Sequence, residues 1–422
     1  MRLYRGSLSL AAVCAACLVI VPVLAQQDDG RQGQAADVAL SFRGGNQDTP
    51  RFHRHQGRNI PNHFIVVLDQ DVNGLDVDPT SEMTAAIDAD QLILGTSSGR
   101  VEHVFSHALR GFSAEMTEAE AIALSNDPRV RFVEEDSIVS IDTTQNNATW
   151  GIDRIDQVAL PLSHTYTFTT TGSGVNAYVI DTGIRITHQQ FGGRASVAFD
   201  AVGDGRNGID CNGHGTHVSG TIGGSTFGVA KSVRLFAVRV LNCQGSGTNS
   251  GVIAGVDFVT RSHVSPAVAN MSLGGGVSTA LDTAVQNSIN SGVTYAIAAG
   301  NSNTNAANSS PARVSAAITV GASTINDARA SFSNFGSVVD IFAPGQNITS
   351  AWATSDTATN TISGTSMATP HVAGVAARYL QTHTTASPAT VRNAIVAAAS
   401  LNRLTGIPAG TANRLLFWSG AQ

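Results

Sequence analysis

Charged side chains are scarce in this chain, and lysine is almost absent. Only 13% of the 422 residues are charged, about half the usual share, and Lys231 is the single lysine. The formal net charge of −6 excludes a strongly basic nucleic-acid binder. A hydrophobic fraction of 42% excludes a disordered chain, and 42 glycines without a three-residue period exclude collagen. The length is that of two or three domains.

Long apolar runs are also missing after the first 25 residues. Leu8 to Leu24 is apolar, follows a short basic start, and ends at the small residue Ala25. This is the layout of a secretory signal peptide, whereas a membrane anchor would be longer and have charged flanks. We expect residues 1–25 to be removed and the protein to be secreted, extracellular and free of the membrane. The charge-poor, small-residue composition fits a tightly packed exported enzyme.

Charge divides the rest of the chain. Residues 26–142 carry 20 acidic residues and 9 arginines, a net charge of −11, whereas residues 143–422 carry 11 acidic and 14 basic residues, a net charge of +3. Two unrelated domains would explain this, and so would a prosegment complementary to the domain that it precedes. Residues 26–59 are polar and aperiodic and are expected to be a flexible leader.

Residues 60–142 have the pattern of a small α+β domain. Thr117 and Glu120 are spaced as a capping box, which marks the start of the second helix. The order strand-helix-strand-strand-helix-strand is the ferredoxin-like, split βαβ layout. The expected strands are 63–68, 101–107, a segment after 109–114, and 130–136, and the expected helices are 81–94 and 117–125.

Residues 143–422 alternate strands and helices, which predicts an α/β fold with a mostly parallel sheet. Strands are expected at 175–180, 235–241, 267–271 and 293–298, and a helix at 369–379. Asp181, the glycine loop Gly274 to Gly276, and Asn301 each follow a strand, where open α/β sheets place their ligands.

Three short stretches contain an acid, an imidazole and a hydroxyl in that order. Asp181 ends an apolar strand, His214 lies among small residues, and Ser366 lies in a turn just before a helix. A serine hydroxyl needs an imidazole to accept its proton and a carboxylate to orient the imidazole. The order Asp-His-Ser is that of subtilisin rather than of chymotrypsin or the α/β-hydrolases.

The residue sequences of these stretches are more specific than the order of their acid, imidazole and hydroxyl groups. The segments 179–183, 212–220 and 363–371 resemble the three active-site signatures of subtilisin-like serine proteases. The segments 150–155, 228–231, 271–276 and 331–334 narrow the resemblance to the proteinase K-like branch, close to aqualysin. It covers essentially all of 143–422 and implies a three-layer peptidase fold. Residues 60–142 resemble the family's inhibitor propeptide, which is also an intramolecular chaperone.

The resemblance implies a role for each site residue. Asp181 orients His214, His214 is the general base and then the general acid, and Ser366 is the nucleophile. Asn301 and the Ser366 N–H would bind the oxyanion. For His217 and His371, which also lie in the signatures, we expect structural packing.

The same match implies the substrate contacts. No acidic residue lies in the expected walls, so a trypsin-like preference is not expected, and we predict broad endoproteolysis after large apolar or aromatic residues. The implied contacts are Gly245, Ser246 and Gly247 at the edge that pairs with substrate, and Ser272, Leu273, Gly274, Gly275, Ala298, Ala299 and Gly300 around the P1 pocket.

Cys211 and Cys243 are the two cysteines outside the signal peptide. In an exported protein an even pair suggests a disulfide, although two free thiols are the alternative. Both positions match a bridge of the aqualysin-like branch. The positions of that branch's second bridge hold Ala307 and Val338 here.

The resemblance also implies structural calcium and no catalytic cofactor. Asp340 matches the family's calcium carboxylate, and the carbonyl groups of Ser315 and Ala317 would complete that site. A second set resembles a calcium site near the mature N-terminus: Asp153, Asp156 and Gln157. Oxygen ligands suit calcium, but each acid could equally be a helix cap or a surface residue.

The expected partners are peptide substrates and the chain's own propeptide. We also expect self-cleavage near Asp142-Thr143 and a mature monomer without a C-terminal extension.

Among the alternative functions, a zinc hydrolase would need a glutamate that His214-x-x-His217 lacks, and a lipase would need G-x-S-x-G around Ser366. A peptide-binding pseudoenzyme is disfavoured because all four catalytic positions are intact.

Overall fold

The computed structural model describes residues 51–54, 59–69, 89, 92–93, 99–137 and 143–419. The expected signal peptide, most of the expected leader, most of the expected helix 81–94, and Asp142 lie outside these residues. Within the described ranges, no helix has the length and apolarity needed to cross a bilayer.

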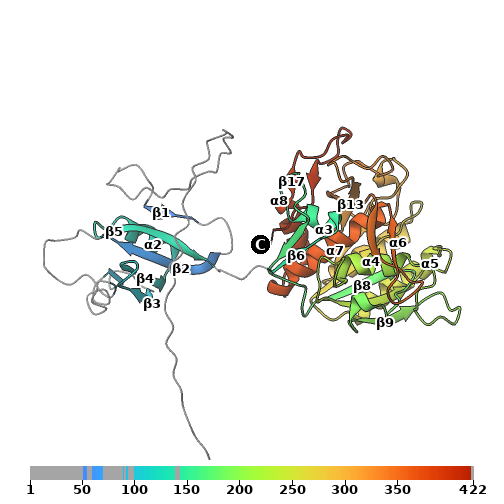
Figure 1. Cartoon of the computed structure of the whole chain (residues 1–422), viewed down its shortest axis with the longest axis horizontal. Helices are drawn as coiled ribbons and strands as arrows, with labels where there is room; N and C mark the ends of the chain where they lie inside the picture. The colour runs from blue at the N-terminus through green and yellow to red at the C-terminus, as the bar shows by residue number, and fades with distance from the viewer. Residues whose placement is uncertain are drawn as a thin grey trace, which may run out of the picture. The chain divides into compact units, whose positions relative to one another are not determined.

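The N-terminal part of the described chain is a five-stranded sheet in the order β1-β5-β2-β4-β3, with α2 packed on it (Figure 1). The four strands β5-β2-β4-β3 have the expected ferredoxin-like order, and the capping box is confirmed because Thr117 and Glu120 cap each other's backbone. The elements are β1 Phe52–His53, β2 Asn59–Leu68, β3 Arg100–Phe105, β4 Gly111–Glu115, α2 Glu118–Ser125 and β5 Val130–Ser137.

Strand β1 corrects the expectation of a flexible leader over 26–59. Phe52 and His53 pair in parallel with β5, and the Phe52 ring lies 6.0 Å from that of Phe64. A two-residue strand has no periodicity that could be recognised in a sequence. Its pairing depends on β5, about 80 residues further along the chain.

Residues 143–419 contain a nine-stranded sheet in the order β17-β18-β14-β13-β12-β11-β8-β10-β9. Figure 1 labels β8, β9, β13 and β17 of this sheet. All its neighbouring strands are parallel except β17 and β18, which confirms the mostly parallel sheet. Its strands are β8 Asn176–Asp181, β9 Ala195–Asp200, β10 Arg234–Arg239, β11 Ala267–Met271, β12 Thr294–Ala298, β13 Ile318–Ser323, β14 Ile341–Pro344, β17 Ser400–Leu401 and β18 Arg414–Leu415. Two further pairs are β6 Thr143–Asn146 with β7 Thr165–Phe168, and β15 Ile348–Ala351 with β16 Thr359–Ile362.

Helices cover both faces of this sheet, as the side chains of β8 demonstrate. Ala177 and Val179 join an apolar cluster with α4 and α7, whereas Tyr178 and Ile180 join a second cluster with α5 and α6. Successive residues of a strand face opposite sides, so the fold has three layers as expected. The helices are α3 Trp150–Ile155, α4 His214–Gly223, α5 Asn249–Ser262, α6 Thr279–Asn290, α7 Thr365–Thr382 and α8 Pro388–Ala398, with 3-10 turns η1 Gln189–Phe191 and η2 Ala306–Asn308.

Helix α7 begins at Thr365, four residues earlier than expected. Ser366 therefore lies in the first turn of the helix and not in the turn before it. The expectation was wrong because Ser, Gly and Thr at 363–366 favour turns, whereas extended Gly364 lets the helix begin directly after it.

Candidate active site

Three neighbouring strands bring the expected site residues together. Strands β8, β11 and β12 are adjacent and parallel, so their carboxyl ends lie at one edge of the sheet. Asp181 ends β8, Ser272 directly follows β11, and Asn301 follows β12. Helix α4 begins with His214, and α7 supplies Ser366 in its first turn.

Asp181 and His214 are joined in the structure. Nδ1 of His214 lies 2.8 Å from Oδ1 and 3.0 Å from Oδ2 of Asp181, which is fully buried. Burial alone would lower the pKa of the imidazole, but the charge of Asp181, its hydrogen bond and the charge of Asp210 together raise this pKa. Nδ1 as the donor to Asp181 leaves Nε2 as the nitrogen that can accept a proton.

A second buried carboxylate, Asp210, holds the segment that precedes His214. Its Oδ1 accepts hydrogen bonds from the Thr182 hydroxyl and the Gly213 N–H, both at 2.9 Å. Its Oδ2 accepts from the Thr216 N–H at 2.9 Å and the Thr216 hydroxyl at 2.6 Å. Asp210 lies outside the three stretches that resemble active-site signatures. An acid four residues before the histidine, next to a cysteine, is the signal that could have identified it.

Ser366 makes a hydrogen bond away from His214. Its hydroxyl donates to the carbonyl oxygen of Ser272 at 3.0 Å, and within the described residues no hydrogen bond joins it to His214. The Ser272 hydroxyl donates in turn to the Ser366 carbonyl at 2.8 Å. That carbonyl lacks its usual helical partner because Pro370 has no N–H. Hydrogen bonds between nucleophile and base are often completed only when substrate binds.

Asn301 and Ser366 border one space. Asn301 Oδ1 accepts from the Thr365 N–H at 2.8 Å and from the Thr365 hydroxyl at 2.9 Å, which leaves Nδ2 free of this pair. A methyl group placed on Gly364 would lie 3.5 Å from Asn301 Nδ2 and 3.6 Å from the Ser366 nitrogen. Both nitrogen atoms therefore border the space beside Gly364. Thr365, to which the sequence analysis gave no role, fixes the orientation of the amide.

Two clefts border these side chains. One has a volume of about 520 Å³ and includes His214 in its wall, and the other has about 370 Å³ and includes Asn301 and Ser366. Among the described residues that line these two clefts there is no aspartate, glutamate, lysine or arginine. Gly245, Ser246, Gly247 and Ser272 line the larger cleft, Ala298, Ala299 and Gly300 line the smaller one, and Leu273, Gly274 and Gly275 line both.

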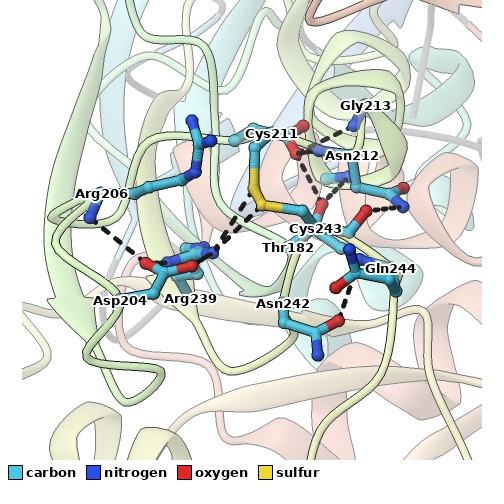
Figure 2. Close-up of a disulfide and its surroundings, with 12 residues drawn as sticks. Thr182, Asp204, Arg206, Cys211, Asn212, Gly213, Arg239, Asn242, Cys243 and Gln244 are labelled. Carbon is cyan, nitrogen blue, oxygen red and sulfur yellow. Dashed lines mark hydrogen bonds and ion pairs between the residues drawn. A yellow bond between two sulfur atoms is a disulfide. The ribbon is translucent and has the colours of Figure 1, made fainter.

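Cys211 and Cys243 form a disulfide in the structure. Figure 2 shows the Arg239 side chain reaching toward both sulfur atoms and toward Asp204. Hydrogen bonding from Arg239 lowers the pKa of Asp204 to about 2. The Asn212 amide donates to the Cys243 carbonyl at 2.9 Å. The bridge thus ties the segment before His214 to the segment that leads into residues 245–247.

His217 and His371 are both buried. Nε2 of His217 lies 2.9 Å from the Ile348 carbonyl, and Nδ1 of His371 lies 2.9 Å from the Met367 carbonyl. Burial lowers the pKa of each imidazole to about 4. These contacts agree with the packing role expected for both residues.

The first expected calcium site is shared with an arginine. Asp340 Oδ2 accepts from the Thr319 N–H at 2.8 Å, and Oδ1 pairs with Arg392. Burial raises the pKa of this carboxyl, although the Thr319 hydrogen bond and Arg392 act against the rise. Of the two residues expected to contribute carbonyl ligands, Ala317 is buried and Ser315 is exposed. A cation at Asp340 would have to displace Arg392.

The second expected set of calcium ligands includes a carboxylate oxygen that can accept a further contact. Asp153 accepts from the Ser163 hydroxyl and from the His164 N–H, and Gln157 donates to it. Asp156 Oδ2 accepts from the Thr167 N–H, but its Oδ1 is buried and has no hydrogen-bond partner among the described residues. Burial raises the pKa of Asp156 to about 6. An unpartnered buried carboxylate oxygen fits a cation, so this set suits calcium better than Asp340 does.

Comparisons with known proteins cover both parts of the chain. Residues 172–415 match the subtilase family, and residues 63–142 match peptidase inhibitor I9. An extracellular serine proteinase of Thermus sp. is 53% identical, with 88% of this chain and 93% of that protein aligned. Proteinase R of Parengyodontium album is 43% identical, with 86% and 90% aligned.

A solved structure agrees with these relatives. A cold-adapted subtilisin-like serine proteinase superposes with a TM-score of 0.63 and 57% identity, and the match covers 64% of this chain and 98% of that one. Alkaline serine exoprotease A of Vibrio alginolyticus is 51% identical, with 85% of this chain and 67% of that protein aligned. The chain therefore belongs to the subtilase family: it is a secreted, proteinase K-like serine endopeptidase with an I9 propeptide domain.

Proposed function

We propose that this chain is the zymogen of an endopeptidase that uses Asp181, His214 and Ser366 to hydrolyse peptide bonds through an acyl-enzyme. The observation that carries the proposal is the convergence of three features at one sheet edge. These are the Asp181–His214 pair, the Ser366 hydroxyl in the first turn of α7, and the two N–H donors beside Gly364.

Catalysis begins when Ser366 rotates about its Cα–Cβ bond and leaves the Ser272 carbonyl. Its Oγ adds to the substrate carbonyl carbon while His214 Nε2 takes the hydroxyl proton, and Asp181 stabilises the imidazolium. The oxyanion is bound by the Ser366 N–H and Asn301 Nδ2. Loss of such a side-chain donor costs about 3–4 kcal/mol in a subtilisin. His214 then protonates the leaving amine, and a water that it activates hydrolyses the ester.

Substrate specificity follows from the two clefts. Their described wall residues include no charged side chain apart from His214 when it is protonated, so an arginine or lysine side chain has no carboxylate to pair with among them. The smaller cleft, of about 370 Å³, has room for a large apolar or aromatic P1 side chain. Gly245, Ser246 and Gly247 would pair with extended substrate backbone.

Calcium has a structural role in this proposal and takes no part in the reaction. Asp153, Asp156 and Gln157 would hold one ion, supported by the unpartnered Oδ1 of Asp156. Asp340 with the carbonyl groups of Ser315 and Ala317 would hold another once Arg392 moves aside.

Maturation divides the chain at the domain boundaries that the sequence predicts. Residues 1–25 are the signal peptide, and residues 60–142, together with β1 from the end of the expected leader 26–59, form an inhibitor and folding aid for the peptidase domain 143–422. The net charge of the prosegment is opposite in sign to that of the peptidase domain, which supports the proposal that the two are complementary. Self-cleavage near Asp142-Thr143 releases the mature monomer.

Intact mass spectrometry of secreted wild type and Ser366→Ala tests the proposal. We expect the wild type to lose about 117 residues and the mutant to retain them, because only the wild type has the nucleophile. Equal trimming of both proteins would assign processing to another protease. A P1-varied peptide series then tests specificity, and a strict Arg or Lys preference would contradict the proposal.

A further inference from the structure

Asn334 is a buried residue whose side chain is bonded entirely to one loop. Its Nδ2 donates to the Ala299 carbonyl at 2.8 Å. Its Oδ1 accepts from the N–H groups of Ser302 and Thr304, both at 3.0 Å. Only 1% of the residue is exposed. The three partners lie on both sides of Asn301, so the side chain brackets the oxyanion donor.

Backbone contacts bring Asn334 still closer to the donor. Its N–H donates to the Gly300 carbonyl at 2.9 Å. Gly300 has a φ of +103°, and a methyl group on it would lie 2.4 Å from Asn334 Nδ2. The Asn334 amide therefore packs directly against the residue before Asn301, and this glycine is required both for its conformation and for the close contact.

The hydrogen bonds of the Asn334 side chain are not needed to hold the segments 299–306 and 332–335 together. The N–H groups of Asn303, Asn334, Phe335 and Ala306 each donate to a carbonyl of the other segment, at 2.8 to 3.0 Å. The Asn334 side chain adds something different, because it fixes the local path of residues 299–304. A buried amide with three such bonds would be costly to misplace.

Asn301 is thus held from two sides. Thr365 holds its side-chain oxygen, and Asn334 holds the backbone on which that side chain stands. Asn334 also lines the smaller cleft together with Ala299 and Gly300. An error of about 1 Å in the placement of a catalytic donor is enough to lose most of its effect.

We propose that Asn334 is the positioning residue that sets the oxyanion donor Asn301. The inference rests on the proposed function, because it presumes that Asn301 binds the oxyanion. Asn334 itself touches no reacting atom. Its substitution should therefore reduce transition-state stabilisation while leaving ground-state binding nearly unchanged.

The test is a double-mutant cycle with Asn334→Asp and Asn301→Gly, measured as kcat and KM on one peptide substrate. Aspartate keeps the oxygen that accepts from Ser302 and Thr304 but turns an acceptor toward the Ala299 carbonyl. We expect at least a tenfold loss of kcat with KM changed less than threefold, and less than a threefold further loss when Asn301 is already glycine.

Asn176→Asp is the matched control. Asn176 is also 1% exposed and donates to a backbone carbonyl, that of Val264, but it lies at the opposite end of β8 from Asp181. It should retain kcat although it also buries a carboxylate. Asn334→Ala, which adds no charge, repeats the test if the aspartate variant does not fold.

Each other outcome overturns the assignment. If Asn334→Asp lowers kcat equally with and without the Asn301 amide, Asn334 has a purely structural role. A change in KM alone would lead to the same conclusion. If neither Asn334 variant folds in the Ser366→Ala background, Asn334 is required for the fold and not for positioning. If Asn301→Gly itself leaves kcat unchanged, the oxyanion assignment of the proposed function fails instead.

Discussion

The hydroxyl of Thr182 donates to the carboxylate of Asp210 at 2.9 Å. Thr182 follows Asp181 in the chain, and Asp210 lies four residues before His214. Because Asp210 also accepts from Gly213 and Thr216, one buried carboxylate connects the two segments that carry Asp181 and His214. It also places a second negative charge near the imidazole.

Asp210→Asn should lower kcat/KM at least tenfold and move the acid limb of its pH profile to lower pH. In the proposed mechanism activity requires neutral His214, and removal of a nearby negative charge lowers the pKa of the imidazole. The control is Asp204→Asn, whose carboxylate pairs with Arg239. An acid limb that stays in place, or moves to higher pH, would show that the charge of Asp210 does not act on His214.

Acid should destabilise the fold through His217 and His371, which are both buried. The pKa of His217 and of His371 is about 4 in the folded protein, against 6.5 for an exposed imidazole. The unfolded chain therefore binds more protons between these values, so stability falls as pH decreases from about 6.5 to about 4. The full effect is on the order of 3 kcal/mol for each ring.

Urea unfolding at several pH values in the Ser366→Ala background measures this slope. His371→Asn should make the slope shallower, since one of the two rings no longer titrates. The exposed His383→Asn is the control and should leave the slope as it is. Identical slopes for all three proteins would exclude His371 as a source of acid lability.

Lys231 should react with acylating reagents at unusually low pH. Its Nζ donates to the Ser225 and Gly228 carbonyls and lies 5.4 Å from the Tyr166 ring centroid. Burial, together with the charges of Arg378 and Arg194, lowers the pKa of its ammonium group to about 8. Peptide mapping after pulse acylation should give half-maximal labelling near pH 8 in the folded protein. The urea-unfolded protein should need about pH 10.4, and equal midpoints would contradict the shift.

Calcium should stabilise the protein through Asp156. We expect calcium to raise the Tm of the Ser366→Ala protein relative to a chelator, and Asp156→Asn to lose most of that rise, because the amide cannot supply a charged ligand. Asp340→Asn, made separately, reports on the other expected site. A full calcium effect in the Asp156 variant would place the ion elsewhere.

Short-range patterns were sufficient to predict much of this molecule. Apolar strands followed by Asp181, a glycine loop or Asn301 predicted both the parallel sheet and the edge at which the site lies. The Thr117–Glu120 capping box, whose two residues are three apart, was also recognisable. In each case the relevant signal lies within one turn or one strand.

The remaining features depend on residues that meet only in the folded chain. Thr365 orients Asn301 across 64 residues, and Arg392 reaches Asp340 across 52. No local pattern encodes such a pair. For the same reason the strand at Phe52, which pairs with a strand about 80 residues away, could not be predicted.

Both clefts are lined without a permanently charged side chain. Ionic screening acts on charge–charge attraction and leaves apolar burial and backbone hydrogen bonding largely intact. Substrate binding in these clefts does not depend on charge–charge attraction, so salt has none to screen. The KM for an uncharged peptide should therefore hardly change between dilute buffer and molar salt.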